Sequence, residues 1–244
     1  MMKMKDFNEE LSKAIKIFWT IRESQKLNQG TKTGKKDAGN RSAVTGGKQM
    51  DGFTHLIKDL LVDNGLDDAE IILKNAVLPG YFRPAKEWDL IVKSNNTLVA
   101  TIEFKSQVGS FGNNFNNRIE EALGSATDLW TAYREGVFKP SQRPWLGYFI
   151  LLENHPKSTN PVRVAEPHYS VFNEFKDSSY AKRYEIFCEK IMRERLYDAS
   201  CFIMSDKEIG VNGKFSIPNE ELSFEKFATS LIAKATIFAN HKNK

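Results

Sequence analysis

Hydrophobic positions in the first 65 residues recur with the spacing of two amphipathic helices. In residues 6–26 the positions at helical spacing predict one buried face. The same spacing returns from Met50-Asp51 to Asn64-Gly65, where the chain can stop a helix because glycine tolerates the left-handed backbone. A polar, glycine-rich stretch separates the two predicted helices. The helical-spacing positions of the first helix are Leu11, Ile15, Phe18, Trp19 and Arg22.

The pattern becomes strand-like after residue 70. Glu70–Leu78 reads as a strand that ends at Pro79-Gly80, and two further strands at about 88–92 and 98–105 flank a short polar connection. After these strands the sequence predicts a polar turn at 109–117, a helix marked by apolar positions from Ile119 to Tyr133, and a buried strand at 145–152. The order is helix, strand, strand, strand, helix, strand, and its final strand–helix–strand unit implies a parallel pair.

The remainder predicts a helix at about 180–197, a strand at 200–205, a hairpin near 211–213 and a closing helix at about 223–240. We predict one α/β domain spanning 1–244. Its core covers about 50–152, with a helix and basic loop at 1–49 and C-terminal additions at 153–244. The predicted fold class is a mixed sheet flanked by helices.

Two carboxylates and a lysine converge if the strands around the polar connection form a hairpin. Successive strand residues point to opposite faces, so Glu103 and Lys105 share a polar face while their apolar neighbours point away. A hairpin centred on Asn96 places Asp89 opposite Glu103, with Cβ atoms roughly 5 Å apart. Carboxylates at that distance repel unless a cation lies between them. The pattern therefore predicts a Mg²⁺ site beside a lysine.

An acid on one strand and Glu-x-Lys on the next, within this element order, resemble the arrangement of PD-(D/E)xK nucleases. Phosphodiester hydrolysis needs a metal that neutralises charge and acidifies water, and hard oxygen ligands suit Mg²⁺. Asp89, Glu103 and the backbone carbonyl of Phe104 are the predicted ligands, and Mn²⁺ is expected to substitute. Lys105 would orient or deprotonate the water. Taken alone, this motif is weak, because a Glu-x-Lys pair on the polar face of a strand is usually a surface salt bridge.

The segment after this strand is rich in amides. Asn and Gln side chains read adenine edges, arginine reads guanine, and helix N-termini bind phosphate. The alternative is that Asn116 or Asn117 caps the next helix and the rest forms a turn. The candidate DNA-binding residues here are Ser106, Gln107, Asn113, Asn114, Asn116, Asn117 and Arg118.

Charge adds a second candidate surface. The net charge of +4 and pI of about 8.9 permit a polyanionic partner without requiring one. Lys26–Lys48 is basic and poor in apolar residues, so it is either a solvated loop or an arm that orders on DNA phosphates. Arg41, Lys48 and Gln49 are the DNA-binding candidates of this region.

Two further residues have competing interpretations. Arg83 either contacts phosphate or pairs with a surface acid. Asp51 is either a third acidic group of the site or a first-turn acid favoured by the helix dipole. Neither choice follows from the sequence.

The sequence also limits the compartment. No apolar run is long enough for a membrane helix, and the first residues lack the apolar stretch of a secretory signal, so we expect a cytoplasmic protein with no membrane partner. Cys188 and Cys201 lie in apolar contexts without paired spacing. They are predicted to be free, buried thiols.

Longer stretches resemble the XhoI-type restriction endonucleases. Glu103–Gln107, Phe111–Arg118 and Glu120–Trp130 carry the resemblance, together with Arg41–Phe53, Pro79–Pro84 and Glu87–Leu90. Trp88 stands where the wider superfamily has a proline, which is common but not chemically required. The resemblance covers nearly the whole chain. It implies a Mg²⁺-dependent type II enzyme that cuts double-stranded DNA at CTCGAG after the first C, leaving 5′ overhangs and 5′-phosphates, with a cognate methyltransferase in a restriction–modification system.

A palindromic site makes a homodimer the natural assembly. The apolar stripe of the closing helix is a candidate dimer surface, although part of that stripe must be core. Two alternatives remain open: a non-catalytic DNA-binding protein that kept the nuclease core, and a repair nuclease that cuts without sequence choice.

Overall fold

A five-stranded mixed sheet organises the computed structural model, which describes residues 6–27 and 48–239. The strands lie in the order β1-β4-β5-β6-β7, and neighbours are antiparallel from β1 to β5 and parallel from β5 to β7. The helices predicted near 50–64, 119–133, 180–197 and 223–240 and the strands predicted near 88–92, 98–105, 145–152 and 200–205 occur in the predicted order, whereas the short strand at 85–87 was not predicted. The strand bounds are β1 (Ile71–Ile72), β4 (Leu90–Ser94), β5 (Thr97–Gln107), β6 (Trp145–Glu153) and β7 (Ala199–Ser205).

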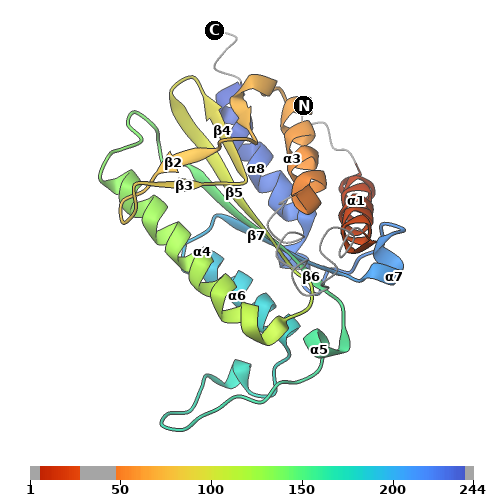
Figure 1. Cartoon of the computed structure of the whole chain (residues 1–244). Coiled ribbons are helices and arrows are strands. Elements are labelled where there is room, and N and C mark those ends of the chain that lie inside the picture. Colours follow the sequence, from red (N-terminus) through yellow and green to blue (C-terminus); the bar gives the residue numbers. More distant parts are fainter. Residues whose placement is uncertain (1–5, 28–47, 240–244) are drawn as a thin grey trace.

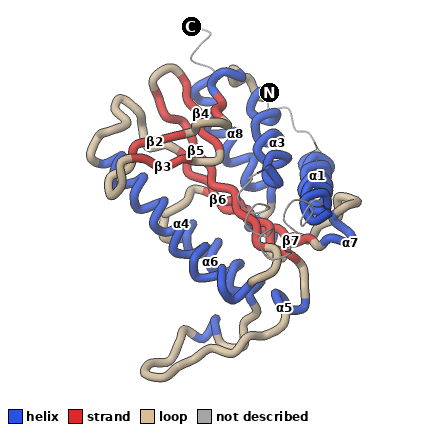
Figure 2. Tube along the Cα trace, in the orientation of Figure 1, coloured by secondary structure: helices blue, strands red, loops and turns tan. Residues whose placement is uncertain are grey.

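Helices cover both faces of this sheet (Figures 1 and 2). One face packs against α1 (Phe7–Leu27), α3 (Asp51–Asp63) and α8 (Phe224–Ala239), and the other against α4 (Phe111–Arg134) and α6 (Tyr180–Arg193). A separate two-stranded sheet lies beside α4 and pairs β2 (Val77–Pro79) with β3 (Ala85–Glu87). The short elements are η2 (Lys48–Met50), η3 (Asp68–Glu70), α5 (Pro156–Thr159), η4 (Asn173–Phe175), α7 (Lys207–Gly210) and η5 (Glu220–Leu222).

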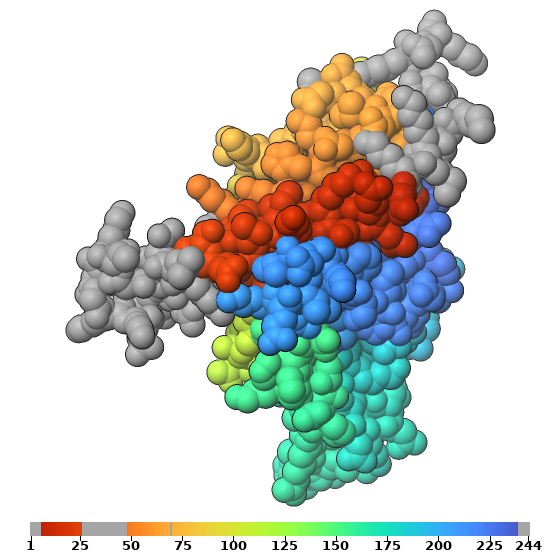
Figure 3. Space-filling model, turned by 90° about the vertical axis from the view of Figure 1, so that its right-hand side faces the viewer, coloured from red at the N-terminus to blue at the C-terminus, as the bar shows by residue number. Residues whose placement is uncertain are grey.

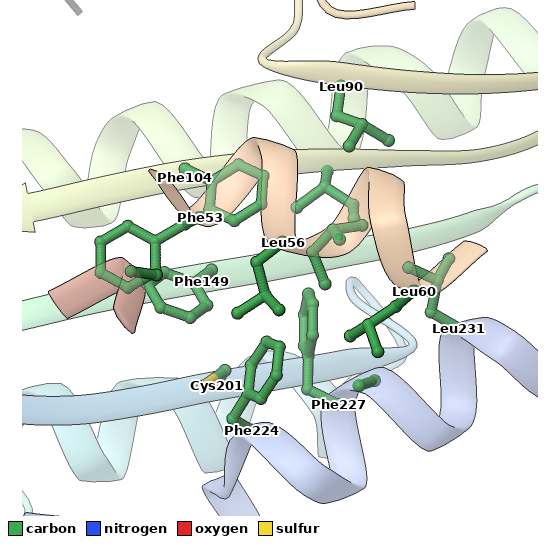
Figure 4. Close-up of a cluster of buried hydrophobic side chains, with 14 of the residues drawn as sticks. Phe53, Leu56, Leu60, Leu90, Phe104, Phe149, Cys201, Phe224, Phe227 and Leu231 are labelled. Atoms are coloured by element: carbon green, nitrogen blue, oxygen red, sulfur yellow. The ribbon is translucent and has the colours of Figure 1, made fainter. Parts of the chain in front are cut away.

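The core on the α3 side is built from aromatic and aliphatic side chains of strands and helices (Figure 4). The Phe149 ring of β6 lies 4.8 Å from the Phe53 ring of α3 and 5.3 Å from the Phe104 ring of β5, measured between centroids. Both β6 and β7 are buried almost throughout. Strands covered on both faces read as continuous apolar runs, which explains why β6 was recognisable from sequence.

The N-terminal helix is part of this core. Figure 3 shows α1 in red across one face of the molecule, between the orange α3 and the blue C-terminal part. Its Leu11, Ile15 and Phe18 side chains are fully buried. The helix therefore holds its last turn in a fixed position relative to the end of β5, which matters for the site.

The C-terminal region joins the same sheet and core. The apolar side chains of α8, including Phe224, Phe227 and Leu231, are each 1% exposed and pack on the sheet. Most of the stripe is therefore core, as part of it was expected to be, and a dimer contact through α8 stays a prediction. Cys188 and Cys201 are free and buried, as predicted. Within the described ranges no helix is long and apolar enough to cross a membrane.

Two predicted boundaries were wrong. The strand expected at 70–78 is divided between β1 and β2, in different sheets, because the chain turns at Asn75 with φ 53°. The polar turn expected at 109–117 ends early, since α4 begins at Phe111. Gly109 and Ser110, with φ of 69° and 47°, make the turn, and the Phe111 ring then stacks on His155 and starts the helix. Tertiary packing overrides the weak helix propensity of the asparagines.

Candidate active site

A β-bulge aligns the two acids of the site. The β4–β5 turn pairs Ser94 with Thr97, and this register continued evenly would set Asp89 against the apolar Ile102. Instead β5 carries one extra residue, Val99, so that Val92 pairs with Ala100 and Leu90 with Ile102. Extending that register by one residue places Asp89 opposite Glu103, as predicted. A one-residue slip would have moved the carboxylate to the wrong face.

Glu103 lies at the centre of a charged cluster and is 2% exposed. Its Oε1 atom lies 2.8 Å from Lys105 Nζ and 3.5 Å from Lys86 Nζ. On the α4 and α6 side its Oε2 atom lies 3.4 Å from the Tyr197 hydroxyl, which also donates to the carbonyl of Ala122 at 3.0 Å. The carboxylate is therefore fixed from three directions and balanced by two lysines. It is not a surface salt bridge.

Asp89 lies in the bend before β4 and accepts a hydrogen bond from the backbone N–H of Phe104 through Oδ2 at 2.8 Å. Asp89 is exposed, yet the walls of the cleft that it lines reduce its hydration. This desolvation raises the pKa of Asp89 above its ordinary value, against the opposing effects of the Phe104 hydrogen bond and Lys105. A carboxylate held in this way gains from a nearby cation.

Lys105 keeps its charge in this environment. Desolvation lowers its pKa, but the charge and hydrogen bond of Glu103 outweigh that effect, and the pKa lies above its ordinary value. Glu121 of α4 adds a second carboxylate 3.6 Å from Lys105 Nζ. Around Lys105 the geometry thus favours a cation and hydrogen-bond donor over a neutral amine that accepts a proton.

The open edge of β5 supplies the donors that a hard cation prefers. Within the described ranges, β5 continues from Glu103 to Gln107 after its pairing with β4 has ended, while its pairing with β6 persists to Gln107. In a strand the N–H and C=O groups of one residue face the same edge. The carbonyl of Phe104 therefore faces the Asp89 edge, where its N–H bonds Asp89. Two carboxylates and this carbonyl form an all-oxygen set suited to Mg²⁺. The described ranges hold no cluster of three acidic, His or Cys residues with metal-site geometry, so the set rests on two acids.

A cleft of about 280 Å³ opens beside these residues. It joins Asp89 and Lys105 to Ser106, Gln107, Asn114 and Arg118 among the predicted DNA-binding residues. Gln107 is 2% exposed, and its Nε2 donates to the carbonyl of Gly109, while its Oε1 has no hydrogen-bond partner. Arg118 pairs with Glu121 at 2.8 Å. Two of the three predicted catalytic residues therefore share one cavity with part of the predicted reading residues.

Because α4 already begins at Phe111, the asparagines of this segment lie on different faces of the helix. Asn114 and Arg118, four residues apart, face the cleft, in keeping with helical spacing. Asn113 lines a neighbouring cavity with His155, and Asn116 lines an apolar groove between α4 and α6. Asn117 is exposed. The idea that Asn116 or Asn117 caps the helix is wrong, since both lie inside it.

Among the candidate residues around the start of α3, some line the cleft and others do not. Gln49 is buried, lines the cleft and donates to the Ser106 hydroxyl at 3.2 Å. Lys48 and Asp51 are exposed and are absent from the cleft lining. Asp51 occupies the first turn of α3, the position that a helix dipole favours. Arg41 lies outside the described residues.

Arg83 forms the ion pair that was its alternative interpretation. Its Nε donates to Asp128 Oδ2 at 2.7 Å, and the backbone N–H groups of Tyr81 and Phe82 donate to Oδ1 of the same carboxylate. Asp128 is 4% exposed on α4. This carboxylate clamps the loop between β2 and β3, and the arrangement favours a structural role for Arg83.

Sequence reasoning missed three residues of the site. Lys86 reaches Glu103 from β3 and also lies 4.3 Å from the centre of the Trp88 ring. Tyr197 reaches Glu103 from the connection between α6 and β7. No local signal identifies them, since tertiary contacts alone bring them in. Arg22 lines the cleft from α1. Its signal was present, because it is a charged residue at an apolar-face position of an amphipathic helix.

Comparison with known proteins identifies, over most of the chain, the family that the sequence motifs resemble. The family described as Restriction endonuclease XhoI matches residues 29–217. This chain belongs to the XhoI restriction endonuclease family. It is 55% identical to the type II restriction enzyme BstVI of Geobacillus stearothermophilus over 81% of this chain and 91% of the relative.

Two further relatives are also type II restriction enzymes. Identity is 48% to the type II restriction enzyme XhoI of Xanthomonas vasicola, over 72% of this chain and 71% of the relative. Identity is also 48% to the type II restriction enzyme AbrI of Azospirillum brasilense, over 69% of this chain and 76% of the relative. The prediction of a type II site-specific deoxyribonuclease is confirmed at this level. No solved structure matches the chain.

Proposed function

We propose that this protein hydrolyses double-stranded DNA at CTCGAG, after the first C of each strand, in a Mg²⁺-dependent reaction that leaves 5′ overhangs and 5′-phosphates. The observation that carries the proposal is the cleft in which Asp89 and Lys105 meet Gln107, Asn114 and Arg118, with Glu103 beside them. The family membership supports the restriction activity. The sheet order and the register of Asp89 with Glu103 support a PD-(D/E)xK core.

Asp89, Glu103 and the carbonyl of Phe104 would hold the ion, and Mn²⁺ suits the same oxygen donors. When bound, Mg²⁺ neutralises charge on the phosphate and lowers the pKa of water. The protein contributes the rest. Lys105, held as a cation by Glu103, donates hydrogen bonds to the attacking water or to a phosphate oxygen and stabilises the negative charge of the transition state.

Base reading is assigned to the α4 side of the cleft. Gln107 has a buried acceptor without a partner, which suits an exocyclic amino group of adenine or cytosine. Asn114 and Arg118 lie on the same wall. Because Gln107 follows Lys105 by two residues on one strand, misplacement of a base would also displace the lysine. Specificity and chemistry are thereby coupled.

Two copies are needed to cut both strands of a palindrome, so a homodimer with one site per strand completes the proposal. A cognate DNA methyltransferase would protect the host. The test is digestion of a plasmid that carries CTCGAG. Discrete fragments support the proposal, a smear supports a nuclease without sequence choice, and tight binding without cleavage supports a non-catalytic DNA-binding protein.

A further inference from the structure

Arg22 is a cation from α1 at the wall of the catalytic cleft. Its side chain is half-buried, and its Nη1 donates to Gln49 Oε1 at 2.9 Å. Gln49 in turn donates from Nε2 to the Ser106 hydroxyl at 3.2 Å. Ser106 directly follows Lys105. A chain of two hydrogen bonds therefore connects the last turns of α1 to the strand residue next to the candidate catalytic lysine.

The guanidinium of Arg22 forms no ion pair within the described part of the chain. The carboxylate that acts on it there is Glu153, which attracts the charge without forming an ion pair, and the Nε of Arg22 is buried without a hydrogen-bond partner. Burial lowers the pKa of Arg22 below its ordinary value, against the opposing charge of Glu153. A guanidinium offers five N–H donors, and one neutral amide oxygen satisfies only one of them. A partly desolvated cation is retained at a cost unless an anion completes its environment.

The same cleft contains two more buried polar atoms without partners, Gln107 Oε1 and Arg118 Nε. Each of these two atoms therefore lacks a hydrogen bond that a polar ligand in the cleft would supply. Their positions differ, however. Gln107 and Arg118 lie with Asn114 on the α4 wall, whereas Arg22 comes from α1, which packs on the other face of the sheet. Arg22 therefore approaches the cleft from the side opposite the proposed base-reading wall.

We propose that Arg22 binds a phosphate of the DNA strand in the catalytic cleft and, through Gln49 and Ser106, sets the position of that phosphate relative to Lys105. The inference rests on the proposed function, because it names a backbone contact of the same site. A forked guanidinium matches two phosphate oxygens, and a phosphate supplies the missing negative charge. A base edge would supply no charge, and contacts to phosphate carry no sequence information.

The test compares Arg22→Met with Arg134→Met by fluorescence anisotropy. Arg134 is exposed at the far end of α4, hydrogen-bonds only Thr131 among described residues, and controls for the loss of one positive charge. The probes are a fluorescein-labelled duplex of about 20 bp containing CTCGAG and the same duplex with the site scrambled, in EDTA across a salt series. Circular dichroism melts report folding.

For Arg22→Met we expect affinity to fall by about tenfold on both duplexes, since a charge-assisted contact is lost. The slope of log K against log salt should become shallower by about 0.9, the value for one phosphate contact. Arg134→Met should retain the wild-type slope and affinity. Unchanged values for Arg22→Met, or a loss confined to the CTCGAG duplex, overturn the inference. Wild-type protein that binds neither duplex overturns both this inference and the proposed function.

A second measurement on wild-type protein avoids any folding defect of the variant. Phenylglyoxal modifies accessible guanidinium groups, and mass spectrometry measures the rate at each arginine. The CTCGAG duplex should slow modification of Arg22 by about tenfold and leave Arg134 unchanged, if a phosphate occupies the guanidinium. Equal rates at Arg22 with and without DNA overturn the inference even if Arg22→Met fails to fold.

Discussion

Glu103 and Lys105 form one ion pair, but their removal should affect stability to different degrees. Glu103 is 2% exposed and is the partner of both Lys105 and Lys86. Glu103→Gln therefore leaves two largely buried cations without a carboxylate. Removing one partner of a buried pair costs about 3–5 kcal/mol, and the partial exposure of the lysines points to the lower end. We expect a loss of about 3 kcal/mol, and a fall in Tm of about 6–12 °C for a chain of this size.

Lys105→Met leaves Glu103 with Lys86 at 3.5 Å and the Tyr197 hydroxyl at 3.4 Å. The charge is still balanced, so the expected loss is about 1.5–2 kcal/mol, the lower end of the range for a hydrogen bond to a charged group. Cleavage should nevertheless fall by about 10²–10³ or more in both variants, because each removes a group that acts on the transition state. The two substitutions thus separate the structural from the chemical use of the pair.

The assay combines urea unfolding in EDTA at pH 7.5 with plasmid cleavage in Mg²⁺. Lys93→Met, an exposed lysine of β4, is the matched control and should change stability by less than about 0.5 kcal/mol with full activity. The reasoning is refuted if Lys105→Met destabilises the protein as much as Glu103→Gln does. It is also refuted if Glu103→Gln is destabilised and still cuts DNA at the wild-type rate.

Other predictions follow from the surrounding contacts. Asp89→Asn should abolish cleavage, yet in EDTA the variant should unfold at the same temperature as the wild type or at a higher one. Desolvation raises the pKa of Asp89 and so disfavours its ionised form, and the amide oxygen of the variant still accepts the hydrogen bond from Phe104. A Tm several degrees lower would contradict this. Asp128→Asn should lower the Tm and leave the slope of log K against log salt for DNA binding unchanged. An altered slope would instead indicate that Arg83 contacts a DNA phosphate. Desolvation opposes ionisation of Asp128, but Arg83 and two backbone N–H groups outweigh it and lower the pKa of this carboxyl. The stabilisation that the ionised carboxylate gives to the fold is therefore complete above the ordinary pKa of 3.8 and is lost as the pH falls below it. The Tm difference between wild type and Asp128→Asn should therefore shrink in acid, as melts from pH 7 to pH 3 can measure.

Strong local patterns made much of the fold predictable. The amphipathic repeat of α3 with its Asn64-Gly65 end, the apolar run of β6 and the alternation around Glu103 each report a local environment that the sequence encodes directly. The opposition of Asp89 and Glu103 was also predicted. Its structural cause, the bulge at Val99, could not be, because the choice between two registers depends on which faces the helices cover.

Long-range contacts account for the errors. The start of α4 depends on Phe111 packing against His155, which is 44 residues away in the chain, and local propensity instead predicted a turn. Similarly, the sequence alone does not determine how much of an apolar stripe such as that of α8 the sheet will cover. Lys86 and Tyr197 reach Glu103 only after the chain has folded, so no spacing rule identifies them.

Sequencing of cut ends tests the central claim most directly. A supercoiled plasmid with one CTCGAG is incubated with the protein and Mg²⁺, alongside the same plasmid with that site altered. We predict a single linear product whose ends begin with 5′-phosphorylated TCGA, and no cleavage of the altered plasmid. An intact CTCGAG plasmid, ends at unrelated sequences, or equal cutting of both plasmids would contradict the account.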